Sequence, residues 1–233
     1  MSRYQQVFPG RHAVLPVIHV DSPDQALRSA QVARAAWSDG VFLINHTMRD
    51  DALLTIHDAV ADAHPGWWVG VNCLGMTPER VFAAVSPKVA GVWADNARID
   101  EGREDQPYAE RVSAVRRVRI PGCLYFGGVA FKYQRPVEDL EAACRVAARH
   151  MDVVTTSGPG TGHAADLEKI RRMKRALGNT PLAIASGITP ENVGDYLPHA
   201  DAFLVATGIS ESFTELDPAR VRTLVERVRS FKS

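Results

Sequence analysis

The sequence is poor in cysteine and aromatic residues, and it has no net charge. It has only three cysteines in 233 residues, and none is in a Cys-x-x-Cys spacing, so neither a zinc motif nor a thioredoxin-like motif is present. A small, odd number of scattered cysteines gives no disulfide framework and is typical of a reducing compartment. We therefore expect a cytoplasmic protein.

Neither sign of charge is in excess, because 27 Lys and Arg side chains balance 27 Asp and Glu side chains. Broad electrostatic capture of nucleic acid or of an anionic membrane requires a basic surface, so we expect neither partner. No apolar run is long enough to span a bilayer, and residues 1–12 lack the apolar core of a signal peptide. With 45% hydrophobic and 23% charged residues, the composition is that of a globular protein.

Short apolar runs alternate with longer helical stretches along the whole chain. The runs are mostly continuous, which is typical of strands in a parallel sheet that is covered on both faces. We predict strands at 13–20, 41–45, 67–72, 89–94, 122–130, 152–156, 181–185 and 201–206. We predict helices at 24–37, 51–63, 78–85, 108–118, 137–149, 165–177, 190–197 and 218–231.

The predicted helix starts have capping residues. A hydroxyl or carboxylate residue precedes a proline in Ser22-Pro23, Thr77-Pro78, Thr189-Pro190 and Asp217-Pro218. Such residues accept hydrogen bonds from the first free N–H groups of a helix, and proline suits the first helical position. These pairs therefore support the boundaries of four helices.

Strand–helix alternation implies parallel pairing with right-handed crossovers. Eight units without an interruption favour closure over the competing architecture, a doubly wound open sheet. We predict an α/β fold, a single (β/α)₈ TIM barrel with a closed eight-stranded parallel sheet, in which residues 1–233 form one domain.

Polar residues gather where the predicted strands end, and in such barrels the C-terminal ends of the strands carry the function. They are His19, Asp21, Asn45, His46, Asn72, Asp95, Asn96, Lys132, Thr156, Ser157, Ser186 and Thr207. Of these we predict Asn45 and Asn72 to bind substrate.

Glycine-rich loops follow the last three predicted strands. Their residues predicted to bind substrate are Ser157, Gly158, Gly162, His163, Ser186, Gly187, Thr207 and Gly208. Glycine lets backbone N–H groups approach an anion closely, and many barrels hold a substrate phosphate in these loops. We predict that these loop residues together form a phosphate clamp. Alternatively, the glycines serve only tight turns, and His163 is simply exposed. On this reading, Gly208→Asp should weaken ligand binding without affecting the fold.

Three residues are candidates for catalysis. Asp95 could be a general base or acid, or a carboxylate bonded within its own loop. Lys132 could form a Schiff base, contact an anion or lie exposed. His19 could transfer protons, bind a divalent metal together with Asp21 and His46, or be a core histidine. No cofactor is predicted, and no spacing signature requires the metal.

Several motifs resemble the BtpA/SgcQ family of (β/α)₈ barrels. They are Pro16-Val17-Ile18-His19, Gly70-Val71-Asn72, residues 126–132, Ser157-Gly158, Thr161-Gly162, residues 166–169, residues 186–193, Tyr196-Leu197, Ala200-Asp201 and Thr207. The loop after the first predicted strand is shorter than is usual in the family, and Tyr133 stands where the family often has histidine.

The resemblance implies the barrel fold and a ligand site at its mouth. It associates one branch with photosystem I biogenesis and another with sugar or nucleoside metabolism. The last two loops also resemble those of ribulose-phosphate-binding barrels, by analogy of fold. We expect an enzyme that acts on a small phosphorylated substrate, a sugar phosphate or nucleotide, by isomerase, lyase or phosphoribosyl-transfer chemistry. The alternative is a non-catalytic assembly or regulatory protein that keeps the pocket, and a homo-oligomer is compatible with either.

Overall fold

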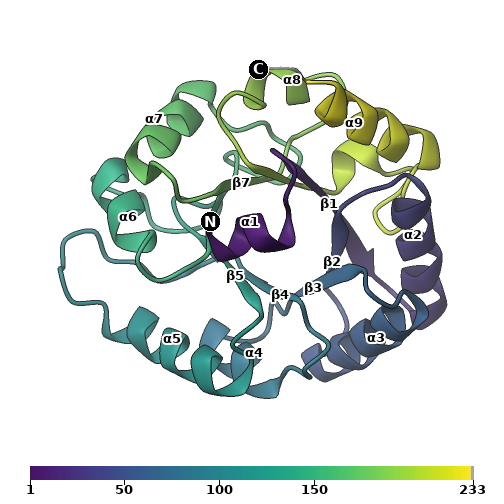
Figure 1. Cartoon of the computed structure of the whole chain (residues 1–233), viewed down its shortest axis with the longest axis horizontal. Coiled ribbons are helices and arrows are strands. Elements are labelled where there is room, and N and C mark those ends of the chain that lie inside the picture. Colours follow the sequence, from purple (N-terminus) through teal and green to yellow (C-terminus); the bar gives the residue numbers. More distant parts are fainter. Residues whose placement is uncertain (232–233) are drawn as a thin grey trace.

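The computed structural model describes residues 1–231, and its strands form one closed barrel (Figure 1). The strands are β1 (Ala13–Val20), β2 (Gly40–Asn45), β3 (Trp68–Asn72), β4 (Gly91–Ala94), β5 (Leu124–Gly128), β6 (Val153–Thr156), β7 (Leu182–Ala185) and β8 (Ala202–Val205). Each strand pairs in parallel with the next, and β1 pairs with β8. The predicted closed barrel is confirmed, and the open sheet is excluded.

Helices surround the sheet (Figure 1). They are α1 (Arg3–Val7), α2 (Pro23–Ala35), α3 (Asp50–Ala63), α4 (Pro78–Ala84), α5 (Pro107–Arg119), α6 (Leu140–Ala147), α7 (Leu167–Leu177), α8 (Val193–Tyr196) and α9 (Pro218–Ser230), with a 3₁₀ turn, η1 (Thr207–Ile209). Within the described residues, none of these helices is both long and apolar enough to cross a membrane.

Helix α1, which was not predicted, lies across the centre of the ring (Figure 1). The hydroxyl of Tyr4 donates a 2.7 Å hydrogen bond to the carbonyl of Asp201, which directly precedes β8. The ring of Phe8 packs 5.3 Å from that of Trp68, the first residue of β3. Helix α1 therefore closes the N-terminal end of the barrel and leaves the C-terminal end as the open one.

Two of the four predicted caps are confirmed as side-chain caps. Ser22 accepts a hydrogen bond from the Gln25 N–H, and Asp217 accepts two from the first turn of α9. Thr77 precedes α4 but makes no capping hydrogen bond. The predicted helix at 190–197 was too long, because Thr189 caps a preceding turn and α8 begins only at Val193.

The core has two layers because side chains alternate between the faces of each strand. Along β1, Leu15 and Val17 point into the barrel interior, where they join Phe42, Trp68 and Phe126. The alternate residues Val14, Ile18 and Val20 belong to the layer between sheet and helices. Both faces of the sheet are buried, which explains the continuous apolar runs. Several strands are shorter than predicted because residues such as Val89 and Val129 are buried in loops that flank the strand pairing.

Candidate functional site

A cavity of about 460 Å³ opens at the C-terminal ends of the strands, within the roughly 300–1,000 Å³ range of small-molecule sites. It is lined by Val17, His19, Ile44, His46, Leu74, Trp93, Asp95, Lys132, Tyr133, Thr161, Gly162, Ala185, Ser186, Leu204, Ala206, Thr207 and Phe213. Six residues predicted for the site therefore share this cavity: His19, Asp95, Lys132, Gly162, Ser186 and Thr207. The other seven lie behind or beside it.

His19 lies on β1 at the floor of the cavity, with only 8% of its surface exposed. Its Nδ1 is buried and has no hydrogen-bond partner within residues 1–231. Burial, together with the neighbouring His46, lowers the pKa of His19 to about 4, although the hydrogen bond to the Phe213 backbone opposes the shift. The imidazole is therefore neutral at physiological pH and has one nitrogen free to accept or donate a proton.

Asp95 follows β4 and faces the same cavity. Burial raises the pKa of its carboxyl, and this effect is opposed by the hydrogen bond from Asn72 and by the charges of Lys132 and His46. Asn72 on β3 is buried and donates from Nδ2 to Oδ1 of Asp95 at 2.9 Å. Asn72 therefore orients a cavity carboxylate from behind and does not line the cavity.

Lys132 belongs to the β5–α6 loop and is partly buried. Its Nζ donates to Oγ1 of Thr161 at 3.1 Å, and its backbone N–H donates to Oγ of Ser157 at 2.8 Å. Ser157, directly after β6, is fully buried and supports the lysine without lining the cavity. This placement gives the cavity a cation beside the hydroxyl of Thr161.

Two residues of the β5–α6 loop are held in left-handed backbone conformations. Ala130 has φ of 48° and Tyr133 has φ of 61°, which costs non-glycine residues on the order of 1 kcal/mol each. The Ala130 carbonyl accepts hydrogen bonds from Lys169 Nζ at 2.6 Å and from Thr156 Oγ1 at 3.1 Å. These bonds hold the loop that presents Lys132.

Lys169 was not predicted as part of the site. It lies in the first turn of α7, and its Nζ also donates to the Ser157 carbonyl at 2.8 Å, so that it joins the loops after β5 and β6. Burial lowers its pKa to about 8. In the sequence, Lys169 was distinguished only as part of residues 166–169, one of the motifs that resemble the BtpA/SgcQ family. We regard Lys169 as a positioning residue for Lys132.

Asn45, at the end of β2, supports the loops and does not line the cavity. Its Nδ2 donates to the Met48 carbonyl and to Oδ1 of Asp50, both at 2.9 Å. Its Oδ1 accepts from the Leu74 N–H at 3.0 Å. Asn45 thereby connects the loop after β2 to the loop after β3, and it holds Leu74 in the wall of the cavity.

The glycines after β6, β7 and β8 lie where backbones come very close together. A Cβ at Gly158 or Gly187 would lie 2.1–2.2 Å from the His163 carbonyl oxygen, and one at Gly208 would lie 2.0 Å from that of Ile188. Gly187 also has φ of 68°. These contacts pack the three loops against one another. The expectation that Gly208→Asp would spare the fold is therefore wrong, because any side chain there requires the loop to move.

His163 lies outside the cavity lining. It is exposed, and its Nδ1 lies 3.2 Å from the Thr161 carbonyl. His163 contributes to loop packing through its backbone carbonyl, which lies against Gly158 and Gly187. Ser186 lines the cavity, and its hydroxyl donates to the Gly160 carbonyl at 2.9 Å, so that it links the sixth and seventh loops.

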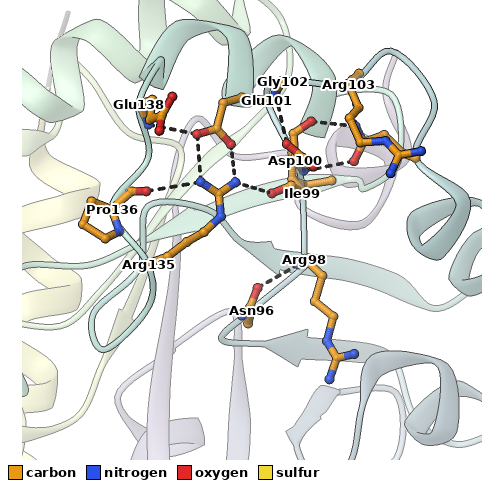
Figure 2. Close-up of polar contacts among 11 residues, drawn as sticks. Asn96, Arg98, Ile99, Asp100, Glu101, Gly102, Arg103, Arg135, Pro136 and Glu138 are labelled. Atoms are coloured by element: carbon orange, nitrogen blue, oxygen red, sulfur yellow. Dashed lines mark hydrogen bonds and ion pairs between the residues drawn. The ribbon is translucent and has the colours of Figure 1, made fainter.

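An ion pair joins the loops after β4 and β5 beside the cavity (Figure 2). The guanidinium of Arg135 donates to Oε1 of Glu101 at 3.0 Å and to the Ile99 carbonyl at 3.3 Å. Glu101 also accepts from the Glu138 N–H at 2.9 Å. The hydrogen bonds from Arg135 lower the pKa of Glu101 to about 2. This pair stabilises the two loops that carry Asp95 and Lys132.

Eleven residues of the lining were not predicted as substrate contacts, and Phe213, Leu74 and Tyr133 are among them. Phe213 lies after β8, and its ring centroid lies 4.3 Å from that of His19 and 5.1 Å from that of His46. Apolar loop residues carry little signal in a sequence, because nothing local shows which element they will face.

The divalent metal site suggested for His19, Asp21 and His46 is not formed. Within residues 1–231, no three side chains of the metal-binding types come together in a group that could hold an ion. His19 and His46 pack with their rings 4.8 Å apart at an interplanar angle of 70°, in contact with each other and with Phe213.

The cavity can therefore support proton transfer beside a cation. It combines a neutral imidazole, a carboxyl group with a raised pKa and the ammonium group of Lys132. Groups whose pKa is displaced by burial and specific neighbours are common in acid–base catalysis, although structural networks produce them too.

Solved structures share this fold at low sequence identity. Phosphoribosyl anthranilate isomerase from Thermus thermophilus is 18% identical with a TM-score of 0.66, over 94% of this chain and 100% of that chain. Geranylgeranylglyceryl phosphate synthase from Thermoplasma acidophilum, in complex with sn-glycerol-1-phosphate, is 16% identical with a TM-score of 0.68, over 98% and 97%. The tryptophan synthase alpha subunit from Legionella pneumophila is 12% identical with a TM-score of 0.71, over 99% and 100%.

No curated protein matches the sequence. The model of the BtpA family matches residues 99–230, which is more than half of the chain. The matched segment runs from the loop after β4 to the last residue of α9 and includes Lys132, Ser186 and Thr207. The chain therefore belongs to the BtpA family.

Proposed function

We propose that this protein is an enzyme that acts on a small phosphorylated molecule by proton transfer, as an isomerase, a lyase or a phosphoribosyl transferase. The observation that carries the proposal is the convergence of His19, Asp95 and Lys132 with the hydroxyls of Ser186 and Thr207 on one cavity. Barrel enzymes of similar fold, one of them in complex with sn-glycerol-1-phosphate, support the choice of a phosphorylated ligand.

The phosphate lies against the sixth, seventh and eighth loops in this proposal. Thr161, Ser186 and Thr207 bring three hydroxyls to that side of the cavity, and Gly162 admits the ligand close to the backbone. The position of a Gly162 Cβ lies 3.6 Å from Oγ1 of Thr207, so the two loops meet at this point. Lys132, hydrogen-bonded to Thr161, supplies positive charge next to the hydroxyls.

The reacting carbon lies between His19 and Asp95. At neutral pH His19 is neutral, because burial keeps its pKa at about 4. One of the two groups removes a proton from the substrate and keeps it, and the other donates its own proton to a neighbouring atom. Exchange with solvent then restores both groups. Lys132 stabilises the negative charge that develops, and one well-placed donor contributes roughly 3 kcal/mol in a site that excludes water.

A thermal-shift screen against phosphorylated metabolites tests the ligand class. A ligand at about a hundredfold its dissociation constant stabilises a protein by about 2.7 kcal/mol, a shift that is readily measured. Thr207→Val, which removes a cavity hydroxyl, should reduce the shift. Thr223→Val, on the outer helix α9, should not change it. If no phosphorylated compound stabilises the wild type, the ligand class is wrong.

Asp95→Asn tests the chemistry once a substrate is found. The variant keeps the shape of the side chain and loses its basicity, so turnover should be abolished while binding persists. Asp105→Asn, at an exposed loop position, is the matched control and should be active. Full activity of Asp95→Asn would remove Asp95 from the mechanism, and ligand binding without any turnover in the wild type would favour a non-catalytic role.

A further inference from the structure

We propose that the substrate carries a flat aromatic or heteroaromatic ring and that Phe213 forms the wall against which this ring lies. The inference rests on the proposed function, because it concerns the part of the same cavity that the phosphate does not occupy. It narrows the substrate class from any phosphorylated molecule to one with a phosphate at one end and a ring at the other.

Phe213 is an apolar ring held in an exposed position. It is 57% exposed even though one side packs against His19 and His46. It also lines the cavity. An apolar side chain that lines a cavity and is still exposed offers surface that a ligand can bury.

The turn that carries Phe213 is fixed in place. Ser210 pairs with Leu216 in an antiparallel bridge at the base of the turn. Two side chains of α2 hold its tip: Gln25 Nε2 donates to the Thr214 carbonyl at 2.5 Å, and Arg28 pairs with Glu215 at 2.8 Å. Because these contacts hold the turn, the Phe213 ring is already in position before a ligand binds. This reduces the entropy cost of binding.

The lining of the cavity contains both hydroxyls and large apolar side chains. Hydroxyls from Thr161, Ser186 and Thr207 gather on the side proposed for the phosphate. Phe213, Leu74 and Trp93 supply large apolar surfaces elsewhere in the lining, and Leu74 is 43% exposed. An aliphatic sugar phosphate would leave the exposed surfaces of Phe213 and Leu74 in contact with water, whereas a ring would cover them.

Two buried nitrogens in the lining indicate that the ring has a polar edge. Trp93 Nε1 and His19 Nδ1 have no hydrogen-bond partner in the part of the chain that the structure describes. Buried polar atoms are nearly always paired, so such atoms beside a cavity point to a partner supplied by the ligand. An acceptor on a heteroaromatic ring would match the indole N–H of Trp93.

The test compares four probes by titration calorimetry: inorganic phosphate, ribose 5-phosphate, a set of nucleoside 5′-monophosphates, and the nucleosides without phosphate. We expect at least one nucleoside monophosphate to bind the wild type about tenfold or more tightly than ribose 5-phosphate, as expected for aromatic packing. Phe213→Ala should remove that advantage and leave the binding of ribose 5-phosphate unchanged. Trp37→Ala is the matched control, because Trp37 is an exposed aromatic residue outside the cavity, before β2.

The outcomes separate this inference from the proposed function. If ribose 5-phosphate binds as tightly as every nucleotide and Phe213→Ala changes neither, the ring proposal is overturned and the phosphate proposal stands. If a nucleoside binds as tightly as its monophosphate and loses affinity in Phe213→Ala, the ring proposal holds and the phosphate site fails. If no probe binds, both are wrong.

Discussion

Asn72 and Asp95 form a hydrogen-bonded pair between neighbouring strands, with Nδ2 of the amide 2.9 Å from Oδ1 of the carboxyl group. The amide stabilises the carboxylate and counteracts the burial that raises the pKa of Asp95. Asn72 thus acts through Asp95, and it affects the charge of the proposed proton-transfer group without touching the cavity.

Replacement of Asn72 by Leu should raise the pKa of Asp95 further, because the hydrogen bond from Asn72 lowers it and a hydrogen bond to a charged group contributes about 1.5–3 kcal/mol. The measurement is a pH titration of the Asp95 side-chain carboxyl by NMR, with the exposed Asp105 as an internal reference. An unchanged Asp95 titration would show that the amide serves packing only.

His19 makes the fold sensitive to mild acid. Its pKa is about 4 in the folded chain and about 6.5 in its ordinary range, so between these values the unfolded state binds more protons. Stability is therefore lost as the pH falls from 6.5 towards 4, by roughly 3 kcal/mol from this group. In His19→Gln this contribution disappears. The free energy of unfolding, measured with urea at pH 7 and at pH 4.5, should therefore differ less between the two pH values than it does in the wild type.

The exposed His163 is the control for that experiment, because His163→Gln should keep the pH dependence of the wild type. If His19→Gln and wild type lose the same stability between the two pH values, His19 is not protonated in the way that its burial implies.

Gly187 should not tolerate a side chain. Gly187→Ala places a Cβ 2.2 Å from the His163 carbonyl at a backbone φ of 68°. The left-handed conformation alone costs about 1–2 kcal/mol, and the clash adds to it, so we expect a loss of at least about 2 kcal/mol in chemical denaturation.

Gly194→Ala is the matched comparison, since Gly194 lies in α8 and has no atom near the position of its Cβ. That substitution should be neutral or stabilising by up to about 1 kcal/mol. Equal stabilities of the two variants would contradict the close packing of the sixth and seventh loops.

Arg116 should matter for stability and not for ligand binding. Its guanidinium pairs with Asp152 and donates from Nε to the Cys123 carbonyl at 2.8 Å, near the starts of β5 and β6. Removal of one partner from a buried pair typically costs about 3–5 kcal/mol, because the other charge is left uncompensated. Asp152 keeps Arg3 at 3.7 Å and the Tyr125 N–H at 2.8 Å, so Arg116→Met should lower the free energy of unfolding by less than that, about 1–3 kcal/mol, and leave the dissociation constants of cavity ligands unchanged.

Arg103→Met provides the surface comparison. Arg103 pairs with Asp105, and both side chains are more than half exposed, so a change of less than about 1 kcal/mol is expected. A weaker ligand affinity in Arg116→Met would show that the two ends of the barrel are coupled.

The barrel could be predicted from local patterns in the amino-acid sequence. Apolar runs such as that of β1 are continuous because both faces of each strand are buried, and prolines after Ser22 and Asp217 mark where helices begin. These signals are local: they depend on residues a few positions apart, and they recur in every unit. The ends of the strands, and hence the location of the cavity, followed from the same pattern.

Which polar residues face the cavity depends on the packing of the loops, and the sequence did not show it. Asn45, Asn72 and Ser157 end their strands as His19 does, yet their side chains bond to neighbouring loops. Phe213 contacts His19 from almost 200 positions away in the chain, because closure of the barrel pairs β8 with β1. The physical reason is that a hydrogen bond or a ring contact depends on where two distant loops meet, and only closure of the barrel and packing of its loops bring those partners together.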